Sequence, residues 1–98
     1  MASVVVVTAV LTGCSAKAPA MTLNVVTTTT QVTDFTRQIV GTAGTVTGLI
    51  QPNQSAHMFD PSAAQLLALT KANAVVISGA DLEPWITTVL KAANFTGT

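Results

Sequence analysis

Apolar and polar positions along the chain change their spacing several times, and each change marks an expected element. Residues 23–27 (LNVVT) are β-prone and predict a first strand. A spacing of i, i+3, i+4 and i+7 then predicts a helix with one buried stripe. The stripe consists of Val32, Phe35, Thr36 and Ile39. Thr30 is the expected N-cap and Gly41 the expected stop, and we assign the threonine run at 27–30 no special role.

The second half of the chain repeats this alternation. Residues 44–50 predict a weaker strand, because a glycine interrupts it and threonine alternates with apolar residues. Residues 62–65 have the Ser-x-x-Gln form of a capping box and predict a helix that runs to about Ala72. Residues 74–77 (AVVI) form a continuous apolar run of the kind buried in parallel sheets, and residues 78–80 end it.

A last helix is expected after this break, with Pro84 in its first turn. Its apolar face consists of Trp85, Ile86, Val89, Leu90 and Ala93. Asp81 and Glu83 lie where carboxylates stabilise the positive end of a helix dipole. We therefore interpret both as helix-start residues rather than as metal ligands or acid–base groups, and we interpret Trp85 as a core residue.

Three strand–helix pairs in succession predict an α/β fold, with a parallel sheet and helices on both faces. Ligands of such sheets bind beyond the carboxyl ends of the strands. The loop at 51–61 leaves the second strand at that end and carries His57, the only histidine. Because imidazole is a common metal ligand, His57 is a candidate ligand; the alternative is a loop histidine that only satisfies backbone groups.

Composition narrows the class of protein. The 98 residues are 49% apolar, which is enough for one small folded domain. Four basic and four acidic residues cancel and form no run, which disfavours nucleic acid and anionic membrane surfaces as partners. One cysteine and one histidine cannot build a Cys/His zinc cluster, because such a cluster needs four ligands.

The single cysteine follows an apolar run at 4–10. Leu11-Thr12-Gly13-Cys14 is similar to the lipobox of bacterial lipoproteins, so we expect a signal peptide at 1–14, acylation of Cys14 and a tether at 15–22. The apolar run is shorter than the roughly 20 residues of a membrane-spanning helix. Residues 1–3 lack Lys and Arg, so the true start is expected upstream; a buried strand at 3–8 is the alternative.

Four segments occur in an order that resembles one known family. They are 25–27 (VVT), 34–41 (DFTRQIVG), 54–61 (QSAHMFDP) and 74–83 (AVVISGADLE). Over about 23–95 the chain resembles the metal-binding lipoproteins of bacterial zinc and manganese ABC importers. The resemblance implies a two-lobed periplasmic-binding-type fold with four ligands between the lobes, and gives His57 the role of first ligand. Residues 23–98 are then expected to be a partial N-terminal lobe, in a fragment or truncated product, with an incomplete Zn²⁺ or Mn²⁺ site.

The expected function is therefore binding without catalysis. The resemblance implies a lipoprotein anchored on the extracytoplasmic face of the cell membrane, in the periplasm or at the cell surface, that delivers Zn²⁺ or Mn²⁺ to an ABC permease. One alternative is a lipid-anchored surface module that binds protein without metal, as in cell adhesion. An enzymatic α/β domain is disfavoured, because 27–31 lacks the Gly-x-Gly-x-x-Gly phosphate cradle. A hydrolase built on Ser55, His57 and Asp60 lacks the Gly-x-Ser-x-Gly elbow.

Overall fold

The computed structural model describes residue 13 and residues 22–98. Cys14, and with it nearly all of the expected signal peptide and tether, lies outside the described residues. The elements in chain order are β1 (Leu23–Thr27), α1 (Thr30–Val40), β2 (Gly44–Gly48), α2 (Ala63–Lys71), β3 (Ala74–Val76) and α3 (Ile86–Ala92). None of these helices is long and apolar enough to cross a membrane.

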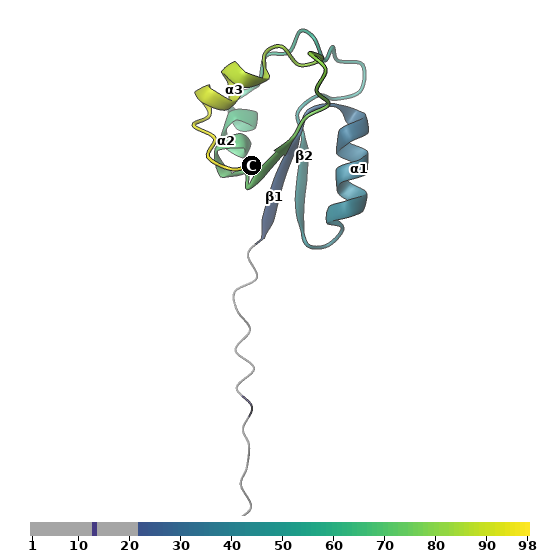
Figure 1. Cartoon of the computed structure of the whole chain (residues 1–98), viewed down its shortest axis with the longest axis vertical. Helices are drawn as coiled ribbons and strands as arrows, with labels where there is room; N and C mark the ends of the chain where they lie inside the picture. The colour runs from purple at the N-terminus through teal and green to yellow at the C-terminus, as the bar shows by residue number, and fades with distance from the viewer. Residues whose placement is uncertain (1–12, 14–21) are drawn as a thin grey trace, which may run out of the picture.

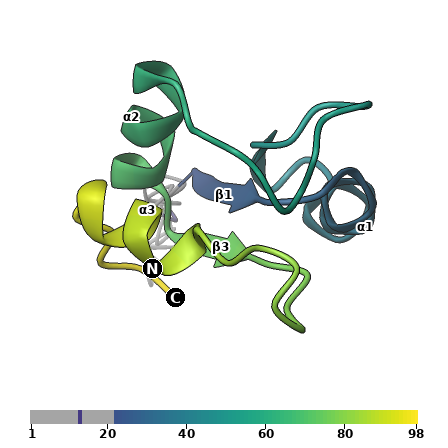
Figure 2. The ribbon, with the colours of Figure 1, turned by 90° about the horizontal axis from the view of Figure 1, so that it is seen from above.

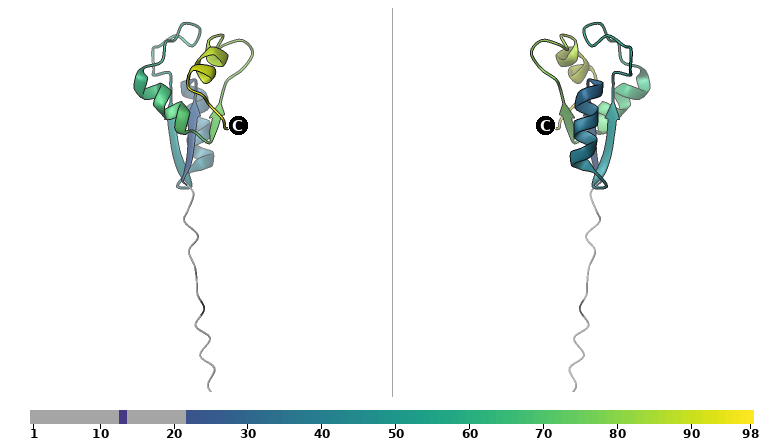
Figure 3. Two further views of the ribbon diagram at one scale, coloured as in Figure 1. Left: turned by 90° about the vertical axis from the view of Figure 1, so that its left-hand side faces the viewer. Right: turned by 90° about the vertical axis from the view of Figure 1, so that its right-hand side faces the viewer.

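The strands form one parallel sheet in the order β2-β1-β3. Val25 of β1 lies opposite Val46 of β2 and Ala74 of β3, which fixes the register on both sides of the central strand. Helix α1 covers one face of the sheet, and α2 and α3 cover the other (Figures 1 and 2). The α/β fold with helices on both faces is thus confirmed. Figure 3 shows the two layers of helices from either side.

The chain after α3 returns to the outer edge of β3. The backbone N–H of Thr98 donates to the carbonyl of Asn73 at 3.1 Å, and the N–H of Val75 donates to the carbonyl of Thr98 at 2.8 Å. This pair of bonds is the pattern of parallel pairing, with Thr98 opposite Ala74. Thr98 therefore lies in the position of a fourth strand, in the same direction as the other three.

The main core lies between the sheet and the two helices α2 and α3. Its buried members are Val26, Leu49, Leu69, Ala72, Val89 and Ala93. The second strand was expected to reach residue 50, but β2 ends at Gly48. Pairing with the chain after β1 nevertheless continues, because Leu49 and Ile50 donate their N–H groups to the carbonyls of Thr27 and Thr28 at 2.8 and 3.0 Å.

Helix α2 follows the sequence prediction closely. The Ser62 hydroxyl accepts from the N–H of Gln65 at 3.2 Å, and the Gln65 side chain accepts from the N–H of Ser62 at 2.9 Å. This reciprocal capping box satisfies two backbone donors that the first turn of the helix leaves free. The helix ends at Lys71, one residue before the expected end.

Helix α1 confirms the predicted stripe at Thr36 and contradicts it at Phe35 and Ile39. Thr33 and Thr36 are its buried residues, whereas Phe35 is 64% exposed and Ile39 is 85% exposed. The reason is a close approach of the helix to β2: a Cβ built on Gly48 would lie 2.7 Å from the Thr33 hydroxyl. Small hydroxyl side chains fit at this distance and large apolar ones do not.

The expected ends of α1 are partly right. The N-cap is Thr29 rather than Thr30, since the Thr29 hydroxyl accepts from the N–H of Val32 at 3.4 Å. Gly41 ends the helix at a φ of 52°, which confirms the glycine stop. Glycine adopts a positive φ at no steric cost, which suits it to this position.

The segment from β3 to α3 differs most from the prediction. Strand β3 ends at Val76. Ala74 and Val75 are only half-buried, and Val76 and Ile77 are 38% and 44% exposed, so the expected burial of this run is wrong. Helix α1 lies over β1 and β2, which leaves its side of β3 without a covering helix in the described residues (Figure 2). Three left-handed residues follow: Gly79, Ala80 and Asp81 have φ values of 80°, 53° and 59°. Helix α3 consequently starts at Ile86, later than expected.

These packing differences predict a contrast between two single substitutions. Ile39→Ala should change the free energy of unfolding by less than about 0.5 kcal/mol, because the Ile39 side chain lies in solvent. Leu69→Ala should lower the free energy of unfolding by about 2–5 kcal/mol, because it leaves a cavity in the core. Urea unfolding of the full chain measures both. A similar loss for the two variants would show that the face of α1 carrying Ile39 is buried in solution.

Candidate metal-binding loop

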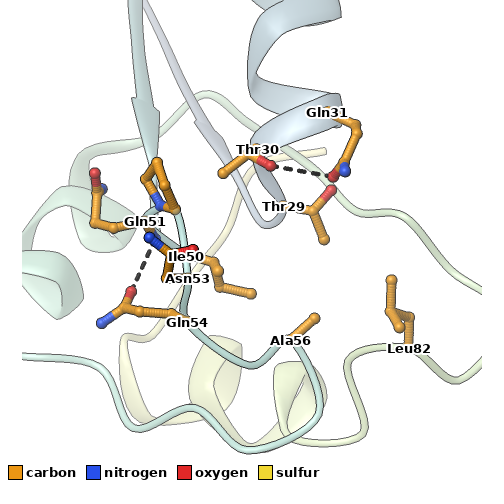
Figure 4. Close-up of a pocket in the computed structure, with 10 residues that line it drawn as sticks. Thr29, Thr30, Gln31, Ile50, Gln51, Asn53, Gln54, Ala56 and Leu82 are labelled. Atoms are coloured by element: carbon orange, nitrogen blue, oxygen red, sulfur yellow. Dashed lines mark hydrogen bonds between the residues drawn. The ribbon is translucent and has the colours of Figure 1, made fainter.

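The loop that carries His57 lies at the carboxyl end of the sheet, as expected (Figure 1). A cleft of about 290 Å³ opens beside it and is lined from the segments that follow all three strands (Figure 4). Its residues are Thr29, Thr30, Gln31, Ile50, Gln51, Pro52, Asn53, Gln54, Ala56 and Leu82. The lining is mostly hydroxyl and amide side chains and carries no charged residue. His57 does not line this cleft but directly follows Ala56, which does.

His57 is exposed on the loop. Its backbone N–H and that of Met58 both donate to the Ser55 hydroxyl, each at 3.3 Å, which closes a local turn. The contact between Ser55 and His57 therefore uses the backbone and not the imidazole. Within residues 22–98 no hydrogen bond engages the imidazole ring, so its nitrogen atoms are accessible to a ligand from solvent.

The two ends of the loop are fixed by glutamine side chains. At its start, the Gln54 side chain accepts from the N–H of Gln51 at 2.8 Å, and the Gln54 N–H donates to the Gln51 carbonyl at 3.1 Å. After its end, the Gln65 amide donates to the Leu49 carbonyl at 2.8 Å. Gln65 also completes the capping box of α2, so one side chain ties this helix to the end of β2.

The middle of the loop contacts Trp85. The indole Nε1 donates to the Ala56 carbonyl at 2.7 Å. The ring of Phe59 lies 4.8 Å from the Trp85 ring between centroids, tilted by 48°. Trp85 is half-buried and packs against the core, which confirms the core prediction and adds a polar contact that the sequence did not indicate.

Glu83 is not a helix-start residue, and that interpretation was wrong. It is 4% exposed and lies before the turn that leads into α3. Its carboxylate accepts a hydrogen bond from the Thr28 hydroxyl, one from the N–H of Ser78 at 2.8 Å and one from the N–H of Gly79 at 3.1 Å. The left-handed turn after Ser78 directs these amide groups at the carboxylate, and so brings Glu83 back to the ends of β1 and β3.

The pKa of Glu83 reflects two opposing effects. Burial raises the pKa, because it disfavours the charged form. The hydrogen bonds from Thr28, Ser78 and Gly79 stabilise the carboxylate and outweigh burial, so the pKa lies below its ordinary value of 4.5. Glu83 is therefore a charged structural anchor at neutral pH.

The remaining carboxylates do not complete a metal site at His57 within residues 22–98. Asp60 and Asp81 are exposed, and Asp81 lies in the left-handed turn instead of at a helix start. In the part of the chain that the structure describes, no group of three or more His, Cys, Asp and Glu side chains is placed to hold a metal ion. The structure therefore places His57 in no such cluster within residues 22–98.

The threonine run at 27–30 does have a role, contrary to expectation. The hydroxyls of Thr27 and Thr33 share a hydrogen bond of 2.7 Å, and those of Thr29 and Ser78 share one of 2.8 Å. Thr28 donates to Glu83. The signal in the sequence was available: consecutive hydroxyl residues that follow a buried strand are themselves buried, and buried hydroxyls need partners.

Comparisons with known proteins match this chain to a family of zinc-uptake proteins. The family described as Zinc-uptake complex component A periplasmic matches residues 25–98. Zinc-binding protein AdcA of Streptococcus pyogenes serotype M3 is 34% identical over 70 residues. The matched segment covers 71% of this chain and 14% of that protein. The chain therefore spans only a small part of its curated relative.

Solved structures have the same fold. The Zn(II)-bound ZnuA-like domain of Streptococcus pneumoniae AdcA superposes with a TM-score of 0.64 at 30% identity, over 74% of this chain and 27% of that domain. The metal-dependent lipoprotein YcdH from Bacillus subtilis has the same TM-score and identity, over 71% of this chain and 26% of that protein. The similarity in fold therefore covers about a quarter of each of these two structures.

Glu83→Gln tests the anchor. The variant keeps the shape of the side chain but replaces one of the two accepting oxygens by an NH2 donor. Its free energy of unfolding should therefore be about 1–3 kcal/mol lower than that of wild type at neutral pH. Because the folded pKa is depressed, the carboxylate's contribution is complete above 4.5 and is lost as the pH falls through the folded pKa. The stability difference between wild type and variant should therefore shrink in acid.

Urea unfolding between about pH 7 and about pH 3 measures this difference. Asp81→Asn is the matched control, because it removes an exposed carboxylate from the same turn. Its free energy of unfolding should stay within about 0.5 kcal/mol of the wild-type value. A Glu83→Gln difference that stays constant across the pH range would contradict the assignment of a charged anchor.

Proposed function

Because the chain belongs to the family of Zinc-uptake complex component A periplasmic proteins, we propose that it is part of a solute-binding protein that captures zinc for an ABC importer. The observation that carries the proposal is the position of His57: an exposed imidazole on a braced loop at the carboxyl end of a parallel sheet. The match of the family to residues 25–98 includes this loop. The permease that receives the ion is the implied protein partner.

His57 acts in this proposal as one zinc ligand. Neutral imidazole binds Zn²⁺ through a ring nitrogen, and a closed zinc site takes four ligands. Residues 22–98 hold no group of three or more candidate ligands, so we propose that His57 contributes to a site that these residues do not complete. The family resemblance supports this arrangement, because it implies a site between two lobes. Zinc is preferred to manganese because the matched relatives are described as zinc proteins, and imidazole suits zinc better than manganese.

The proposed location is the extracytoplasmic face of the cell membrane, held there by acyl chains on Cys14. The sequence at 11–14 supports the anchor, and one solved relative is described as a lipoprotein. Several acyl chains hold a protein stably at a membrane where one chain does not.

Binding without catalysis fits the loop chemistry best. The Ser55 hydroxyl contacts the backbone of His57 and not its ring, so no serine–histidine pair is prepared for nucleophilic attack. The chain after β1 holds threonines in place of a glycine cradle for phosphates.

One observation favours a second function. Phe35 and Ile39 form an exposed apolar pair on α1, which is a feature of surfaces that bind protein. A lipid-anchored module that binds protein without metal is therefore the alternative. The unfolding temperature with and without zinc separates the two proposals. A metal-binding protein should show a rise on adding zinc that a chelator reverses, whereas a module that binds protein without metal should show no change.

His57→Ala tests the ligand role. Titration calorimetry of the full chain with Zn²⁺ should give weak binding, with a Kd above about 1 µM, because one imidazole supplies only part of a coordination shell. His57→Ala should remove this binding. Met58→Ala, which truncates an exposed neighbour, should leave it unchanged. Equal zinc binding by wild type and His57→Ala would sink the proposal, and a parallel Mn²⁺ titration compares the two metals.

Cys14→Ser tests the proposed lipid anchor. In a bacterium that processes lipoproteins, the wild-type chain should partition into the detergent phase and begin at an acylated Cys14. Cys14→Ser should remain in the aqueous phase with residues 1–13 attached. Mass spectrometry of the N-terminal peptide decides the point. A free Cys14 thiol on a chain that keeps residues 1–13 would end the anchor proposal.

A further inference from the structure

Trp85 contacts the loop on both sides of His57. Its indole N–H donates to the carbonyl of Ala56, the residue directly before His57. Its ring packs against Phe59, two residues after His57. One side chain from the turn before α3 therefore contacts the loop on either side of the candidate ligand, through the backbone of Ala56 and the ring of Phe59.

No second hydrogen bond performs this task in the described part of the chain. The bonds from His57 and Met58 to Ser55 stay within the loop. The Trp85–Ala56 bond is the one described hydrogen bond that joins residues 55–60 to the rest of the fold. At 2.7 Å it is also shorter than the local bonds to Ser55, which are both 3.3 Å.

Trp85 is itself held in place. It lies two residues after Glu83, whose buried carboxylate is fixed at the ends of β1 and β3. The Trp85 carbonyl accepts from the N–H of Val89 at 3.1 Å, in the first turn of α3. The indole donor therefore has a fixed position relative to the sheet, and the loop takes its position from the indole.

We propose that Trp85 is a positioning residue for His57. It keeps the loop backbone in one conformation and so presents the imidazole at a fixed place beside the cleft. A ligand that is already ordered binds a metal ion more tightly, because less conformational entropy is lost on binding. This inference rests on the proposed role of His57 as a zinc ligand.

Trp85→Phe separates the hydrogen bond from the packing. Phenylalanine keeps an aromatic ring against Phe59 but has no N–H for the Ala56 carbonyl. Amide hydrogen exchange at His57 and Met58, measured by NMR on the full chain without metal, should become about three- to tenfold faster, the factor expected for one intramolecular hydrogen bond. The Kd for Zn²⁺ should rise by a similar factor, within the range seen when partners of a metal ligand are lost.

Two further variants keep the test decisive. Benzothienylalanine at position 85 replaces the indole N–H by sulfur with nearly the same shape, and should reproduce the effect of Trp85→Phe even if the phenylalanine variant folds poorly. Phe95→Leu is the matched control, because Phe95 packs against the same core and lies outside the loop. It should lower stability while exchange at His57 and the zinc Kd stay at wild-type values.

The outcomes separate this inference from the function on which it rests. Zinc binding that survives His57→Ala overturns the proposed ligand role. Zinc binding that is lost in His57→Ala but is unchanged in Trp85→Phe, with wild-type exchange at His57, overturns the positioning role alone. Faster exchange and weaker zinc binding in both position-85 variants, with neither in Phe95→Leu, support the inference.

Discussion

The buried carboxylate of Glu83 is the interaction on which the functional end of the molecule depends. A charge away from water is costly unless hydrogen bonds replace its hydration, and here Thr28, Ser78 and Gly79 provide them. The same bonds stabilise a turn in which Ala80 and Asp81 have positive φ values, each costing about 1–2 kcal/mol for residues other than glycine. One side chain thus joins the ends of two strands and fixes where α3 begins.

A single residue, Trp85, connects the Glu83 anchor to the loop that carries His57. Trp85 follows Glu83 by two residues and fixes the loop at Ala56, next to His57. The proposed capture of an ion needs an exposed ligand, yet an exposed loop of polar residues has few contacts to order it. The structure meets both needs, because it fixes the backbone from the buried side and leaves the imidazole in solvent.

Much of the fold was predictable from the sequence, because the order of elements follows from apolar spacing and from caps. Strand β1 and the capping box of α2 are local features and were located to within a residue. The predicted buried face of α1 was right at Thr36 and wrong at Phe35 and Ile39, because apolar spacing indicates only polarity, whereas the close approach to β2 selects small side chains. Gly48 admits the helix so closely that Thr33 packs there and Phe35 turns to solvent. Sequence also missed the left-handed turn at Ala80, because alanine seldom adopts it.

The position of His57 was predictable from the sequence, but the contacts that hold its loop were not. The reason is that these contacts join residues far apart in the chain. The loop follows a strand, so its place at the carboxyl end is fixed by topology. Its bond to Trp85 spans 29 residues, and only a folded chain brings the partners together. Ala56 contributes a backbone carbonyl, which any residue there could supply. Trp85 contributes both a ring and an N–H, and since tryptophan alone combines a large ring with an indole donor, position 85 is the more constrained partner.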